Sequence, residues 1–139
     1  MGSFKKSRTV APKLLVDSDR LTEILSVTDV NAQSHNPLSA AEIKGGIVVH
    51  TSATGGGTVT LDTAANIIAG VPLTENGQVV KCYYINDGEE DLTFAQDSGA
   101  TTTISDTGQL CLADEGVLLL VRRVSASAVK VYILGGDAA

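Results

Sequence analysis

Residues 77–134 contain a series of short apolar runs, and each run is separated from the next by Gly, Asp, Asn or Ser. Short apolar runs bounded by turn-forming residues are typical of β-strands. The chain has no Trp and only two Phe and three Tyr among its 139 residues. Its core must therefore be built mainly from Val, Ile, Leu and Ala, and the branched residues suit pleated sheets. We predict an all-β fold, an antiparallel β-sandwich or barrel of about eight strands in a jelly-roll-like order.

The most strongly patterned strand in this stretch is expected at residues 78–86. Both of its faces are apolar, which indicates a central strand or a contact between subunits. We assign Tyr83 and Ile85 to a subunit interface on this basis. Asp87 and Gly88 are expected to make the tight turn of a hairpin, from which residues 92–95 return as an antiparallel strand.

A second interface prediction concerns Arg122 and Arg123, which are adjacent in an apolar strand. A regular strand points one of them to each face, so one arginine is buried against a partner or lies at an edge. A buried arginine needs a carboxylate partner. We therefore interpret the pair as part of a subunit interface rather than as a phosphate site.

The remaining segments predict one short helix and an extended N-terminal arm. Asp62 and Thr63 can cap a helix over residues 64–69, which is followed by Gly70 and Pro72. A capping-box pattern at residues 39–42 can open one further helical turn. We predict an arm over residues 1–37 and a sandwich domain over residues 38–139, which is the single domain expected for this length.

Charge divides the chain in the same way. Residues 1–20 have a net charge of +3, whereas the remainder has −9. A basic arm on an acidic body suggests that the two parts face different surroundings, although a solvated N-terminus is equally compatible. The arm combines basic residues with a short apolar run, and the residues that we expect to anchor it are Lys5, Lys6, Arg8, Lys13, Leu14, Leu15 and Val16. The acidic body argues against nucleic acid as the main partner.

Motifs for catalysis or cofactor binding do not emerge from the sequence. The histidines, His35 and His50, accompany no GxSxG motif, and His50 is read as a core or edge histidine. The Gly-rich run at residues 52–57 lacks the GK[ST] motif of a phosphate-binding loop. The acidic run at residues 87–91 offers oxygen ligands for calcium, but its spacing is not that of an EF-hand, and a solvated turn is favoured. We predict no enzyme activity, cofactor or metal.

The cysteines, the first residues and the lengths of the apolar runs bear on where the protein is made. Cys82 and Cys111 lie in apolar strand contexts and are interpreted as two buried thiols rather than a disulfide. The first residues have no apolar run typical of a signal peptide. No apolar run reaches the length of about 18 residues that a membrane span needs. We expect a protein made in a cytoplasm, with no membrane partner.

Several segments together resemble a known family. These are SAAEIKGGIVV, VTLDTAANIIAGVP, GQVVKCYYINDGEEDLTFA and AVKVYILGG, within residues 38–136. Their order is similar to that of small all-β capsid-associated proteins of tailed phages, of the decoration, cement or head-fibre type. The resemblance implies a virion structural protein, a homotrimer bound to the major capsid protein on the capsid surface, which stabilises the head.

An alternative from another class is the trimeric receptor-binding module of a head or tail fibre. Such a module would present an exposed aromatic platform to a glycan. The tyrosines that could form it are Tyr83, Tyr84 and Tyr132. Three tyrosines without Trp make a thin platform, so the capsid-binding reading is preferred.

Overall fold

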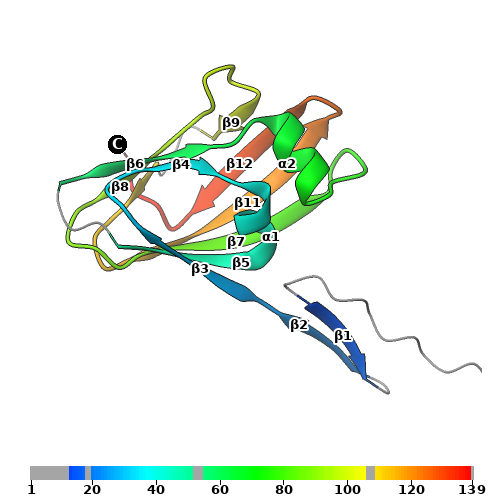
Figure 1. The fold of residues 1–139 in the computed structure, drawn as a ribbon. Helices are drawn as coiled ribbons and strands as arrows, with labels where there is room; N and C mark the ends of the chain where they lie inside the picture. Colours follow the sequence, from blue (N-terminus) through cyan, green and yellow to red (C-terminus); the bar gives the residue numbers. More distant parts are fainter. Residues whose placement is uncertain (1–12, 18–19, 52–54, 106–108, 139) are drawn as a thin grey trace, which may run out of the picture.

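Strands with alternating buried and exposed residues build most of this structure. It is a computed structural model that describes residues 13–17, 20–51, 55–105 and 109–138, and for residues up to 22 it describes only the backbone. A six-stranded and a four-stranded sheet pack face to face, two short helices lie at one end, and a two-stranded hairpin extends away from the body (Figure 1). The predicted all-β sandwich is therefore confirmed. No helix in the described ranges has the length and apolar character that a membrane crossing requires.

The strands fall into three sheets. The arm hairpin consists of β1 (Lys13–Asp17) and β2 (Arg20–Ile24). The six-stranded sheet has the order β3 (Ser26–Asn31), β5 (Gly46–Thr51), β7 (Val79–Asn86), β11 (Gly116–Ser125), β12 (Ala128–Leu134) and β9 (Thr102–Ile104). The four-stranded sheet has the order β10 (Leu110–Cys111), β8 (Leu92–Ala95), β6 (Gly57–Leu61) and β4 (His35–Leu38).

The chain alternates between the two sheets from β3 to β11, so that consecutive strands lie in opposite layers. As a result β3, β5 and β7 are parallel neighbours in one sheet, and β4, β6 and β8 are parallel neighbours in the other. Antiparallel pairing is found where β11 joins β7 and β12, and where β10 joins β8. The sheets are therefore mixed, and the prediction of purely antiparallel pairing is wrong. The ten described strands of the sandwich also exceed the predicted number of about eight, because β3 and β4 belong to it.

The turn at Asp87 and Gly88 shows why the pairing was mispredicted. It does not return β8 beside β7 but carries the chain across to the other sheet. The side chain of Asn86 holds this crossing, because its Nδ2 donates to the carbonyl oxygens of Glu90 at 2.7 Å and Cys111 at 3.1 Å, and its Oδ1 accepts from the Gly88 N–H at 3.0 Å. Asn86 is fully buried, so these bonds replace the ladder of a hairpin.

Two helices, rather than one, close the end of the sandwich. Helix α2 (Ala64–Gly70) begins after Thr63, whose side chain accepts from the Asn66 N–H, as the sequence predicted. Helix α1 (Ala40–Gly45) has the complete capping box between Ser39 and Glu42, so the additional helical turn is real. Each capping arrangement satisfies N–H groups that have no partner within the helix.

The core lies between the sheets and beneath the helices, and it is mainly aliphatic as the composition required. Tyr84 and Phe94 meet edge to face, with ring centroids 5.2 Å apart at 82°. The fully buried aliphatic side chains come from both layers and both helices: Leu38, Ile43, Val48, Val59, Ile67, Leu92, Leu119, Val121 and Val131. One continuous core indicates that the sheets and helices fold as a unit.

The sandwich begins earlier in the chain than the predicted boundary at residue 38. Strand β3 pairs with β5 over residues 26–31, and β4 pairs with β6. Within the described part of the predicted arm, only β1 and β2 lie outside the two large sheets. The projecting arm therefore ends at residue 24.

Candidate interaction surfaces

The two sheets present very different outer faces. On the four-stranded sheet the outward residues include Thr58, Thr60 and Thr93, which water solvates readily. On the six-stranded sheet the outward positions are mostly apolar, and six of the seven exposed large hydrophobic residues in the described ranges lie there: Val27, Val79, Tyr83, Ile85, Val124 and Leu134. We call this surface the outer face. A contiguous apolar surface of this kind marks an interaction site.

A groove of about 530 Å³ runs across the outer face. Its lining is almost entirely apolar, and we call it the apolar groove; it is formed by Leu25, Ile47, Tyr83, Ile85, Gly116, Val117, Leu118 and Leu134. Strands β5, β7, β11 and β12 contribute to it, so the paired register of the sheet fixes its shape. The predicted interface residues Tyr83 and Ile85 are thus brought together on one surface.

Leu25 forms one wall of this groove and also lines a smaller hollow of about 290 Å³. It connects β2 to β3, and its side chain lies against Gly46, where an added Cβ would stand 2.8 Å from Leu25 Cδ2. Gly46 has a φ of +94°, the left-handed conformation that ends helix α1. This glycine therefore lets the helix stop and lets the root of the arm rest on the sheet.

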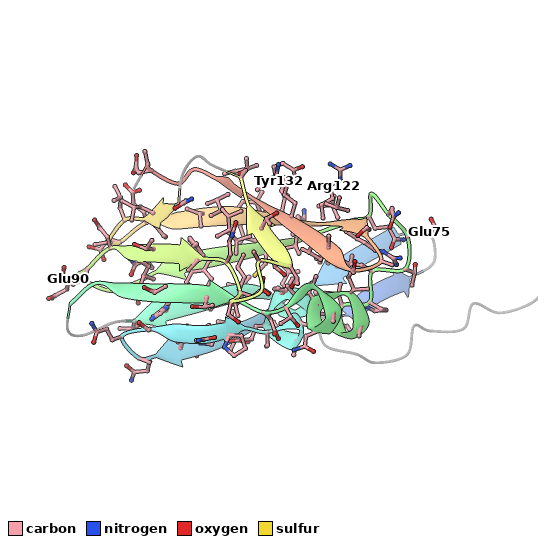
Figure 2. All side chains as sticks on the ribbon, turned by 90° about the horizontal axis from the view of Figure 1, so that it is seen from above. Glu75, Glu90, Arg122 and Tyr132 are labelled. Atoms are coloured by element: carbon pink, nitrogen blue, oxygen red, sulfur yellow. The ribbon has the colours of Figure 1, made fainter. Side chains whose placement is uncertain are left out.

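Three cationic side chains stand on one half of the outer face. Arg122 Nη1 donates to the hydroxyl oxygen of Tyr132 at 3.2 Å, and Lys130 Nζ lies 5.5 Å from the centroid of the same ring. Lys81 is directly opposite Leu120 of β11. Within the described ranges, none of these three cations has a carboxylate partner. In Figure 2, Arg122 and Tyr132 lie side by side at the margin of the body.

The opposite end of the body is acidic. Asp87 and Glu90 lie in the crossing from β7 to β8, and Asp114 and Glu115 precede β11, which starts beside the end of β7. Figure 2 shows Glu90 at the end opposite the helices. On the outer face itself, Asp29 of β3 pairs with Val49, which pairs with Ile85 near the end of β7. Charge is therefore distributed unequally along the strand direction.

Arg123 does not belong to this surface. Its Nη1 donates to the Leu73 carbonyl oxygen at 2.9 Å, and its Nε donates to Asn76 Oδ1 at 3.1 Å. The guanidinium holds the loop between α2 and β7, and neutral oxygens take the place of the expected carboxylate. The prediction that both arginines serve a subunit interface therefore remains a hypothesis for Arg122 only.

The arm hairpin is a second candidate surface. Strands β1 and β2 pair with each other from Lys13↔Ile24 to Asp17↔Arg20 and with no other described strand. Leu14, Leu15 and Val16 occupy the middle of β1, whereas Lys5, Lys6 and Arg8 lie outside the described residues. A two-stranded hairpin by itself is marginally stable in water. This segment is therefore expected to order fully against another surface.

The histidines take part in internal hydrogen bonding. His50 is fully buried, with its Nε2 2.6 Å from the Ala32 carbonyl oxygen and its Nδ1 2.6 Å from the Tyr84 hydroxyl. A carbonyl only accepts, so Nε2 carries the proton and Nδ1 accepts from Tyr84. Burial lowers the pKa of His50, consistent with a neutral ring. His50 is thus a core histidine, as the sequence predicted.

His35 joins the first helix to the neighbouring strand. Its Nε2 lies 2.9 Å from the carboxylate of Glu42, which also accepts from the backbone N–H and the hydroxyl of Ser39. The ring centroids of His35 and His50 are 6.3 Å apart. No local pattern predicts this pairing, because Glu42 lies seven positions after His35 and beyond the cap of helix α1. Its evident role is to fix α1 against β4.

The other chemistry-bearing residues are also placed by the structure. Cys82 and Cys111 are buried free thiols, as predicted, and burial raises their pKa to about 12 and about 11. In the described ranges no group of three or more His, Cys, Asp or Glu side chains is placed to hold a metal ion, so the calcium alternative gains no support. Tyr84 is buried, which leaves Tyr83 and Tyr132 for an aromatic platform.

Comparisons with protein-family models, with curated proteins and with solved structures found no match to this chain. Its function must therefore be inferred from the surfaces described above.

Proposed function

We propose that this chain is a non-enzymatic structural protein of a tailed-phage virion, which binds the major capsid protein on the outer surface of the head and stabilises the shell. The observation that carries the proposal is the arm hairpin, a partly apolar segment that projects from an acidic body and pairs only with itself among the described strands, within an N-terminal stretch (residues 1–20) whose net charge is +3. A segment of this kind orders on a larger surface and extends the area of contact.

Two further features support an assembly role. The outer face leaves a broad apolar surface uncovered, which a monomer in solution rarely does. Both histidines are engaged in internal contacts that tie the fold together. The chain thus has one projecting arm and one apolar face, and these two surfaces suit contacts to a shell and to neighbouring proteins. The resemblance to decoration and cement proteins supplies the identity of the shell.

Co-sedimentation with purified heads of the phage that encodes the chain tests the proposal. The full chain is expected to sediment with heads to a saturating number of copies. A variant that lacks residues 1–24 removes the arm hairpin without cutting into β3, and it is expected to remain folded but to lose binding. Full occupancy by the truncated chain would refute the anchoring role of the arm, and no binding by the full chain would refute the capsid proposal.

A matched pair of variants tests the apolar part of the anchor. Leu15→Asp introduces a charge in the middle of β1, whereas Thr58→Asp introduces the same charge on the polar side of the sandwich. We expect the first variant to weaken head binding and the second to bind like the unmodified chain. Equal binding by both variants would show that the hairpin does not contact the shell.

A further inference from the structure

We propose that the outer face of the six-stranded sheet binds a second copy of this chain, with the two sheets packed face to face and their strands running in opposite directions. This inference concerns the free protein and does not depend on the capsid proposal. It assigns an occupant to the apolar groove and explains why charge is segregated along the strands.

The centre of the outer face exposes large apolar side chains. Tyr83, Ile85 and Leu134 are 39%, 38% and 48% exposed, although they lie in or beside the centre of a sheet. Central strands that carry apolar side chains on both faces are typical of sheets covered on both sides. The core covers only the inner face, and the threonine-rich face of the other sheet shows how this fold adapts a surface to water. The outer face is therefore built to be covered.

The charge pattern selects the occupant. One half of the outer face carries Lys81, Arg122 and Lys130, which have no carboxylate partner among the described residues. Toward the other end, Asp29 lies level with Ile85, and the exposed Asp87 follows the last residue of β7. An occupant that brings carboxylates complements this half, where Glu23 of the arm lines the hollow beside Lys44 and Lys81. A second copy related by a two-fold axis through the groove places its acidic half there and receives the reciprocal contact at the other end. Such a self-complementary patch is the signature of an isologous interface.

The available area is sufficient for a stable pair. The central strands β5, β7, β11 and β12 have six, eight, ten and seven residues. With a rise of about 3.3 Å per residue and a strand spacing of about 4.8 Å, six strands present roughly 600–700 Å². Standard interfaces bury about 600–1,000 Å² per partner, so this area lies at the lower end of that range. Contacts from the arm root at Leu25, which borders the groove, add to this area.

The arm of the same chain is not a suitable cover for this face. Strand β2 leads into β3 through one residue, and the hairpin points away from the body (Figure 1). The homotrimer that the resemblance implies is a different arrangement. When strands run parallel to one another about a three-fold axis, the cationic half of one copy meets the cationic half of the next. The mass in solution therefore distinguishes the two assemblies.

Analytical ultracentrifugation of the full chain tests the pair directly. We expect a dimer at about 50 µM, and the double variant Ile85→Gln/Leu134→Gln is expected to raise the dissociation constant at least about tenfold. The matched variant Thr58→Gln, on the opposite sheet, should leave it unchanged. Far-UV circular dichroism verifies that each variant is folded. A monomer, a trimer, or equal dissociation constants for the groove variant and its control would overturn the proposal.

A charge exchange tests the orientation. The variant Lys81→Glu/Lys130→Glu has an outer face that is acidic at both ends, and Asp29→Lys/Asp87→Lys has one that is basic at both ends. In an antiparallel pair each variant repels itself, whereas the two variants attract each other. We expect each alone to dissociate and their mixture to form a heterodimer at low salt. If neither variant dissociates more than the unmodified chain, the antiparallel orientation is wrong.

Discussion

Replacing Tyr84 with Phe should destabilise the fold by removing one buried hydrogen bond. The Tyr84 hydroxyl donates to His50 Nδ1 at 2.6 Å, and both residues are fully buried. The substitution keeps the ring and its edge-to-face contact with Phe94, so the packing changes little. It leaves Nδ1 of His50 without a partner inside the core, which costs about 1–3 kcal/mol. That loss is a large part of the total stability of about 5–15 kcal/mol typical of a domain.

Tyr132→Phe provides the matched control. The Tyr132 hydroxyl accepts from Arg122 at the surface, where water can replace it, so the expected cost is about 0.5 kcal/mol or less. Urea unfolding of the three proteins at one concentration and about pH 7.5 gives the free energies of unfolding. Equal free energies for the two variants would refute the account of His50 as a hydrogen-bonded core residue.

Three further outcomes follow from the core and the turns. Burial lowers the pKa of His50 below the usual 6.5, so the unfolded chain takes up a proton at a higher pH than the folded chain. The free energy of unfolding should therefore be constant above about pH 6.5 and decrease as the pH falls below it. Urea unfolding across this range should show a weaker decrease for His50→Asn. Because burial raises the pKa of Cys82 to about 12 and of Cys111 to about 11, a thiol reagent at about pH 8 should label them only when the chain unfolds, and rapid labelling of the native protein would contradict their placement. Gly46→Ala should reduce the free energy of unfolding by about 1–2 kcal/mol because of the positive φ, and further because the new Cβ displaces a neighbouring side chain. Gly77→Ala, with a similar φ and open space around it, should show only the contribution from φ. Thermal unfolding compares the two variants, and a larger loss of stability for Gly77→Ala would count against the packing of the arm root.

The sequence specified the elements better than their pairing. Alternating patterns located the strands around Tyr84 and Val131, and the residues before Ala64 located the helix start, because these signals are local. The topology was mispredicted at Asp87 and Gly88. These residues favour a tight turn in either setting, and the choice between a hairpin and a crossing depends on the buried Asn86 side chain, which the pattern does not reveal.

The candidate surfaces were partly predictable. Apolar residues on both faces around Tyr83 and Ile85 indicated a covered sheet, and the structure brings both residues into one groove. The role of Leu25 was missed, because a single leucine in an ambiguous segment has no distinctive spacing. The internal contacts of Arg123 were not predicted, because its partners are the Leu73 carbonyl and Asn76, about 50 residues away in the chain and invisible to a local pattern.

Under the proposed capsid role, a cryo-electron microscopy reconstruction of phage heads that carry this chain tests the central claim most directly. The account predicts a β-sandwich on the outer surface of the shell, with the hairpin of residues 13–24 in contact with the major capsid protein. Heads that carry no such density, or density in which the hairpin points away from the shell, would contradict it.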